Sequence, residues 1–180
     1  MRIVERVSRR WIFFALVAIQ VLVPVGMVAA HEHAISSGKK ILVKAQPIDP
    51  EDFFRGQYVE LRYQFSTVPA TGSVAAGQTI YVILHEGDNG VWSGVFASTH
   101  RPSEDLLASR DLVVIRGKAT YDAQRGEEVS VIYGVETLYV EEGQGPRLEQ
   151  ATSAGRLYVR LSIASSGKAT IAGTELRGGE

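Results

Sequence analysis

An uncharged apolar run near the N-terminus constrains this chain more than any other feature. Residues 11–30 read WIFFALVAIQVLVPVGMVAA, 20 residues without a charge. As a helix rising about 1.5 Å per residue, the run reaches roughly 30 Å, the thickness of the hydrocarbon layer of a bilayer. The sequence predicts either a transmembrane anchor or a signal peptide, because the small residues at 28–30 suit cleavage before His31.

The charges on either side of this run predict an orientation. Residues 1–10 carry four arginines and one glutamate, a net charge of +3. The rest of the chain carries 15 Lys and Arg against 19 Asp and Glu, a net charge of −4. Positive flanks stay on the cytoplasmic side of a membrane. Residues 31–180 are therefore expected outside the cytoplasm, with residues 31–40 as a juxtamembrane linker.

The composition excludes several classes of function. The chain has no cysteine, so disulfides, thiolate metal sites and cysteine nucleophiles are absent. Its net charge of −1 gives no field that would attract nucleic acid, and none is expected as a partner. With 45% apolar residues, the chain is rich enough in hydrophobic side chains to fold.

Beyond residue 40 the hydrophobic pattern repeats every two residues. Val59, Leu61, Tyr63 and Phe65 alternate with polar residues, which is typical of a strand with one buried face. Further strands are predicted at 41–44, 79–85, 91–97, 112–116, 129–133, 157–163 and 169–176. Turns are predicted at 86–90, 125–127 and 165–168. We expect a mostly β domain over residues 41–176, either an antiparallel sandwich or a partly open barrel.

The remaining segments complete this domain. One short helix is predicted at 146–154, with Pro146 at its first position and Gly155 beyond its end. The small, polar segment 66–78 is expected to be a mobile loop. Residues 177–180 are expected to form a frayed tail.

The stretch 49–63, DPEDFFRGQYVELRY, carries the most specific pattern. Asp49 and Pro50 predict a single helical turn, and Gly56 supplies the positive φ that ends it. In the strand that follows, Leu61 and Tyr63 lie on the apolar face and Tyr58 on the polar face. Packing explains tyrosines on such a strand best, and recognition of a partner is the alternative for Tyr58.

Residues 56–63, GQYVELRY, resemble the signature of the GDYXXLXY family of bacterial membrane-associated proteins. Gly56, Tyr58, Leu61 and Tyr63 match it, and Gln57 stands where the family has Asp. The stretch 133–145 is similar to the family's second block, an aromatic strand before an acidic glycine turn. Residues 167–169, GKA, also fit, so that the resemblance spans roughly residues 40–176.

The resemblance implies a membrane setting without an assigned activity. Members of the family tend to occur beside multi-spanning membrane proteins, which implies the bilayer and such a protein as partners. It favours a single-pass anchor in the bacterial inner membrane over a secreted or periplasmic product of cleavage. If the family's Asp binds a cation or a partner's base, Gln57 weakens that property; if it caps a turn, Gln57 can serve.

The residues that carry chemistry in other proteins do not assemble into a recognisable pattern here. His31 and His33 would hold Cu(II) or Ni(II) if cleavage freed the amine of His31, but a solvated linker explains them better. His85 and His100 have no second ligand at a recognisable spacing, and no metal or other cofactor is expected. The acidic residues Glu136, Glu141, Glu142 and Glu149 are interpreted as a solvated face.

No catalytic residues are predicted. Membrane-bound signal peptidases place a serine shortly before a glycine, but residues 45–55 contain neither Ser nor Thr. The Gly-x-Ser-x-Gly motif is absent as well. We therefore expect a non-enzymatic interaction or assembly module that binds a membrane partner through a strand edge or an exposed aromatic patch. The alternatives are a degenerate peptidase-like or hydrolase domain and a small-ligand or metal-binding envelope domain.

Overall fold

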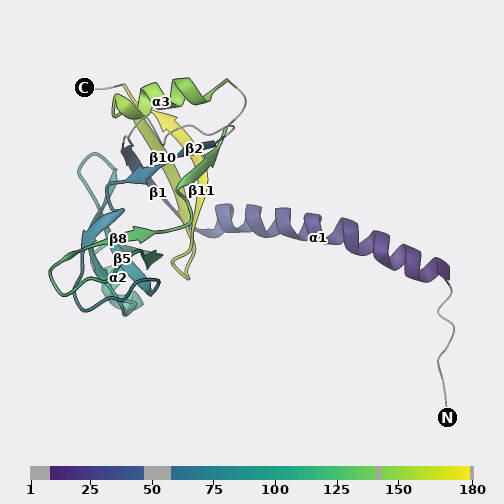
Figure 1. Ribbon diagram of the computed structural model, residues 1–180, viewed down its shortest axis with the longest axis horizontal. Coiled ribbons are helices and arrows are strands. Elements are labelled where there is room, and N and C mark those ends of the chain that lie inside the picture. Colours follow the sequence, from purple (N-terminus) through teal and green to yellow (C-terminus); the bar gives the residue numbers. More distant parts are fainter. Residues whose placement is uncertain (1–8, 47–57, 141–142, 179–180) are drawn as a thin grey trace, which may run out of the picture.

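A long helix projects from one side of a β domain in the computed structural model, which describes residues 9–46, 58–140 and 143–178 (Figure 1). The helix, α1 (Arg9–Ser37), runs without a break through Pro24. Its large apolar side chains from Trp11 to Val28 are exposed. By length and composition α1 can cross a membrane, as the apolar run predicted.

The other elements are short. The strands are β1 (Lys39–Gln46), β2 (Tyr58–Glu60), β3 (Arg62–Tyr63), β4 (Thr67–Pro69), β5 (Thr79–Glu86), β6 (Trp92–Ser98), β7 (Val113–Ala119), β8 (Glu128–Ile132), β9 (Thr137–Tyr139), β10 (Leu157–Ile163) and β11 (Ala169–Leu176). The helices in the domain are α2 (Glu104–Ser109) and α3 (Gly145–Ser153). The predicted helix at 146–154 is confirmed as α3.

Among the described residues, nine strands form one sheet that does not close. Their order is β11-β10-β1-β6-β5-β7-β8-β4, with β3 paired to β1, and β2 pairs with β9 in a separate two-stranded sheet. The named strands pair antiparallel except for β1 and β6, which run parallel. A mostly β fold whose main sheet is open confirms the predicted class.

Alternation along the strands places one face of the sheet in the core. In β10, Leu157, Val159 and Leu161 are fully buried while Arg160 between them is exposed, as the period of two predicted. The main core cluster also takes in residues of β1, β5, β7 and β8, and a smaller cluster packs Leu107 against Ile83 and Val114.

The segment 66–78 is not the free loop that its composition predicted. It contains β4, which pairs with β8, and Val68, Ala70 and Val74 are at most 3% exposed. The backbone N–H of Ala70 donates to Glu127 O, and that of Val74 to Ala123 O. The prediction was wrong because these pairings are made with residues distant in the sequence, which the small, polar composition of the segment does not reveal.

The junction between α1 and the domain is tight. Residues 31–37 continue the helix, and β1 begins after Gly38. The hydroxyl of Ser162 on β10 lies 2.9 Å from Ala34 O and 3.0 Å from Ile35 O, two carbonyls of the last helical turns. A Cβ on Gly38 would lie 2.2 Å from that hydroxyl oxygen, so a glycine is needed for this close approach.

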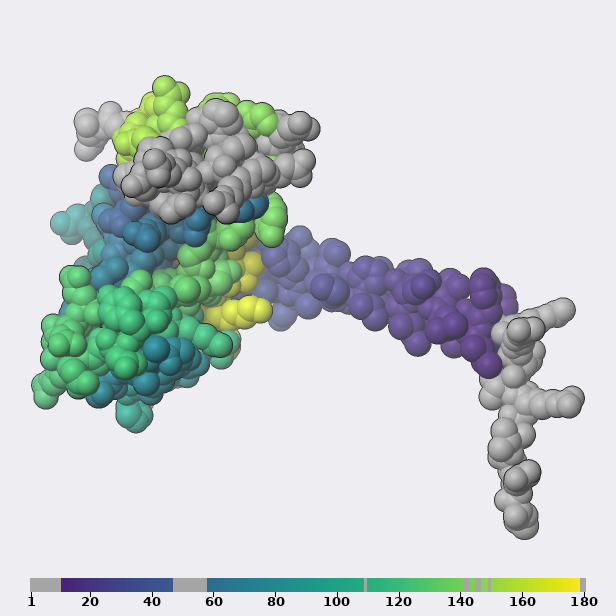
Figure 2. All heavy atoms as spheres, viewed as in Figure 1, coloured from purple at the N-terminus to yellow at the C-terminus, as the bar shows by residue number. Residues whose placement is uncertain are grey.

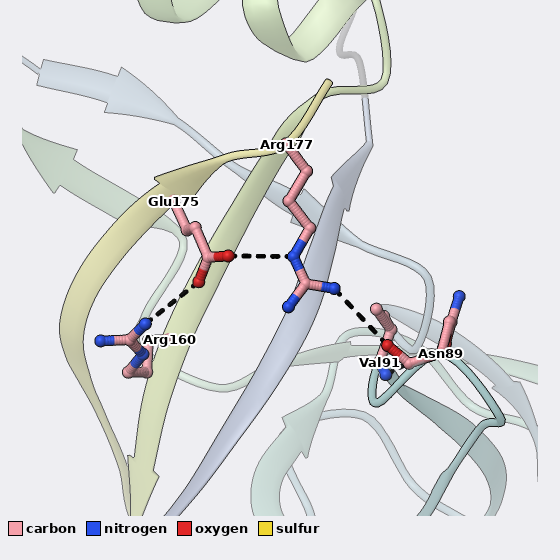
Figure 3. Close-up of polar contacts among 5 residues, drawn as sticks. All are labelled: Asn89, Val91, Arg160, Glu175 and Arg177. Carbon is pink, nitrogen blue, oxygen red and sulfur yellow. Dashed lines mark hydrogen bonds and ion pairs between the residues drawn. The ribbon is translucent and has the colours of Figure 1, made fainter. Parts of the chain in front are cut away.

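An exposed ionic network joins the end of β11 to the β5–β6 turn. Glu175 lies between Arg160 and Arg177, 3.0 Å from each guanidinium (Figure 3). The pKa of Glu175 is held below its usual value, first by the hydrogen bond from Arg177. Arg177 also donates to Asn89 O at 3.5 Å.

Candidate functional site

The motif segment changes sheets in its middle. We predicted one strand over residues 58–65, but it is divided into two. Tyr58 and Glu60 pair with β9, whereas Arg62 and Tyr63 in β3 pair with β1. Between them, the N–H of Leu61 donates to Glu136 O at 2.6 Å. The motif therefore fastens the small β2–β9 sheet to the main sheet.

Tyr63 is sealed in the core. Its side chain is fully buried, and its hydroxyl donates to Val135 O at 2.6 Å. Its backbone N–H donates to the hydroxyl of Ser66 at 3.0 Å, and its carbonyl accepts from the N–H of Ser66. Leu61, two residues earlier, is 1% exposed. Both motif residues that were predicted on the apolar face lie there.

The family's second block, residues 133–145, also donates a hydrogen bond to the motif segment. The hydroxyl of Tyr133 donates to Phe65 O at 2.5 Å, so each segment places a tyrosine hydroxyl on a backbone carbonyl of the other. Glu136 holds the turn between β8 and β9 by accepting from the N–H groups of Tyr133 and Gly134, at 2.6 and 2.8 Å. The positive φ of Gly134 shapes this turn.

Three aromatic rings fill the space between the two segments. Tyr63 and Phe65 stack with centroids 5.2 Å apart, and the ring of Tyr133 meets Phe65 edge to face at 5.2 Å. Burial, and secondly the negative charge of Glu136, raise the pKa of Tyr63 and that of Tyr133 well above the usual range. At neutral pH both hydroxyls are therefore neutral donors, a structural role.

The other two tyrosines of the motif region face outward. Tyr58 and Tyr139 are opposite each other in the β2–β9 pair, and their rings meet edge to face at 6.4 Å. Tyr58 is half-buried, as expected for the polar face, whereas Tyr139 is 80% exposed. This aromatic pair, Tyr58 and Tyr139, is a surface that a partner can contact.

Some predicted site residues are not assembled into this cluster. Gly56 and Gln57 lie outside the described residues. His31 and His33 are exposed on α1, His85 is the next-to-last residue of β5, and His100 contacts the hydroxyl of Thr99. Within the described residues, no three His, Cys, Asp or Glu side chains gather as metal ligands would.

Sequence reasoning missed the role of Glu136, which it assigned to a solvated face. The available signal was its position two residues after Gly134, because a carboxylate that closely follows a glycine turn can accept from the N–H groups of that turn.

Comparison with known proteins agrees with the motif. The family model described as GDYXXLXY protein matches residues 20–173, well over half of the chain. No match was found among curated proteins or among solved structures. The matched region takes in the second half of α1, the motif and nearly the whole β domain. The chain therefore belongs to the GDYXXLXY protein family.

Proposed function

We propose that the protein is a membrane-anchored, non-enzymatic docking module, and that the aromatic pair Tyr58 and Tyr139 contacts a membrane protein of the same envelope. The observation that carries this proposal is the exposure of Tyr139, 80% in a strand that pairs with the family motif. Tyrosine buries a large ring at low entropic cost and keeps a polar hydroxyl, and it is enriched where proteins bind one another.

The position of the aromatic pair also allows a partner to form backbone hydrogen bonds with the β2–β9 sheet. The pair lies in the β2–β9 sheet, which is separate from the nine-stranded sheet among the described residues. An extended segment of a partner can add to such a short strand edge while its side chains contact the rings. The two buried tyrosines, Tyr63 and Tyr133, hold the segments on either side of this small sheet against the core.

The anchor limits where the partner can be. We propose that α1 stays attached and holds the β domain at the extracytoplasmic face of the inner membrane, the orientation that the basic N-terminus favours. Two observations support retention: α1 continues past Ala30 to Ser37, and Ser162 on β10 contacts its last turns. A partner embedded in the same membrane meets this domain at a fixed height.

Photo-crosslinking from position 139 tests the docking surface. A photoreactive amino acid replaces Tyr139 in the full chain, in native membranes, and Tyr121 serves as the matched control because it is exposed at 46% in a different part of the domain. We expect a discrete adduct with a membrane protein from position 139 and none from position 121. Equal adducts from both positions, or none from 139, would contradict the proposal.

A reporter fused after Glu180 tests the orientation separately. We expect a phosphatase that folds only outside the cytoplasm to be active there, and the intact chain to keep its N-terminal 30 residues by mass. Activity of a cytoplasmic reporter at the same position would refute the orientation. Loss of about 30 residues would refute the anchor.

A further inference from the structure

A groove opens where the main sheet fails to close. It has a volume of about 780 Å³ and lies between β7, β8 and the turn that joins β10 to β11. β7 and β8 pair at Lys118–Ile132 and Ala119–Val131 and then diverge. At the point of divergence Gly117 packs under β8, since a Cβ there would lie 2.4 Å from Val131 Cγ1. The separation of the two strands creates the groove.

The β10–β11 turn forms the third side. The N–H of Arg116 donates to Gly167 O at 2.8 Å, which holds the turn against β7. Gly167 has φ +82° and lies so close to Arg116 that a Cβ would be 3.2 Å from its Cβ. This contact places Lys168 beside the outward face of β7.

The charged residues that line the groove are all cations. Arg116 and Lys118 lie two residues apart on one face of β7, and Lys168 faces them from the turn. Among the described residues, no carboxylate lines the groove and none of the three cations forms an ion pair. Ile132, 54% exposed, and Tyr133 add an apolar wall. The lining suits an anion attached to an apolar body.

The groove is close to the C-terminal end of α1, where the helix meets the β domain. Lys39, two residues after the helix, pairs with Ile163 at the end of β10, and the β10–β11 turn follows at once. Figure 2 shows the yellow β11 region against the base of the purple helix. The seven residues 31–37 extend about 10 Å beyond the apolar run, while the headgroup layer adds roughly 5–8 Å on each side of the hydrocarbon. Lysine and arginine side chains reach back across the remaining distance.

We propose that this groove binds the phosphate of an anionic phospholipid headgroup in the leaflet next to the domain. The proposal rests on the membrane anchoring proposed above, but it does not depend on the docking partner. The three cations surround the phosphate, and Ile132 and Tyr133 contact the glycerol and upper acyl chain. Binding would fix the rotation of the domain about α1 and so direct the aromatic pair within the membrane plane.

A lipid titration tests the groove without a bilayer or a partner. The full chain in a neutral detergent is titrated with dihexanoylphosphatidylglycerol, with dihexanoylphosphatidylcholine and with inorganic phosphate. We expect saturable binding of the first and at least tenfold weaker binding of the other two. Equal affinity for the choline lipid would overturn the charge argument, and equal affinity for inorganic phosphate would reassign the groove to a free anion.

Matched variants localise the binding. The triple variant Arg116→Gln, Lys118→Gln, Lys168→Gln should lose at least tenfold in affinity, whereas Arg125→Gln, Arg147→Gln, Arg156→Gln removes the same charge elsewhere and should stay within twofold. The single change Lys168→Gln, on an exposed turn residue, should cost about fivefold and covers the case in which the triple variant does not fold. Equal losses in both triples would refute a specific groove.

Amine labelling in nanodiscs connects the groove to the membrane. The modification rates of Lys118 and Lys168 should fall at least fivefold when phosphatidylglycerol is added to phosphatidylcholine discs. If the titration succeeds but these rates do not change, the groove does not face the headgroups, and the lipid proposal is overturned whether or not α1 is the anchor. Protection by an acidic peptide and not by the lipid would also overturn it, in favour of a protein ligand.

Discussion

The motif region contains two pairs of tyrosines, one that points into the core and one that lies at the surface. Tyr63 and Tyr133 are at most 8% exposed, and each donates to a carbonyl of the other's segment. Tyr58 and Tyr139 meet edge to face at the surface, and Tyr139 is 80% exposed. The inward pair, Tyr63 and Tyr133, holds the two segments together, whereas the outward pair, Tyr58 and Tyr139, leaves ring surface exposed to solvent.

The difference arises from the change of partner strand within the motif. Tyr58 precedes the change and lies on β2, while Tyr63 follows it and lies on β3 against β1. Leu61 stands between them, with its N–H on Glu136 O and its side chain in the core. A signature of tyrosine, leucine and tyrosine can therefore combine a surface position with two structural ones.

Removing an inward ring should have the largest effect. We expect Tyr63→Ala to destabilise the domain by about 3–5 kcal/mol, because a large buried side chain leaves a cavity and Val135 O loses its donor. Denaturant unfolding of the full chain in detergent, followed by the change in tryptophan fluorescence as buried Trp92 becomes exposed, measures this loss. A change below about 1 kcal/mol would show that the cluster does not hold the fold.

High pH should unfold the domain through the same pair. The raised pKa of Tyr63 and of Tyr133 means that the folded state keeps two protons which the unfolded state releases near pH 10. Stability is therefore complete below pH 10 and falls above it, by up to about 1.4 kcal/mol per pH unit for each tyrosine. Denaturation curves between pH 8 and 12 measure the slope, and Tyr63→Phe should halve it. A flat profile would contradict the burial of these hydroxyls.

Removing one inward hydroxyl should have a moderate effect. Tyr63→Phe keeps the ring but leaves Val135 O without its donor, at a cost of about 1–3 kcal/mol. Tyr133→Phe should cost a similar amount because Phe65 O is left unpaired. Equilibrium unfolding of the two variants below pH 9 provides the measurement. Wild-type stability in both would mean that these bonds contribute nothing net.

Removing an outward ring should have the smallest effect on stability. We expect Tyr139→Ala to change the unfolding free energy by no more than about 0.5 kcal/mol, since its side chain is largely in solvent. The same denaturation assay checks this value. A loss above about 2 kcal/mol would mean that the aromatic pair is structural and would weaken the proposed docking role.

The sequence predicted what depends on local pattern. Alternation alone placed Leu61 and Tyr63 on the buried face, and Leu157 with Val159, because a strand's period does not depend on its partner. The turn predicted at 86–90 from its glycines joins β5 to β6, and Gly90 has a positive φ.

What the sequence could not predict depends on distant partners. The break between Glu60 and Arg62 follows from pairing with β9 and β1, and the bond from Tyr63 reaches a residue 72 positions away. The burial of Val68 depends in the same way on its pairing with Val129. The sequence did not predict α2. This helix has only six residues, too few to show a helical period, and its Leu107 packs against Ile83 and Val114 of the sheet.

Tyrosine-selective nitration of the native full chain, read by mass spectrometry, tests the division between the two pairs most directly. Tyr139 should react readily, with the exposed Tyr121 as its reference, while Tyr63 and Tyr133 should remain unmodified until the domain is unfolded. Nitration of Tyr63 at a rate near that of Tyr139 in the folded protein would contradict the account.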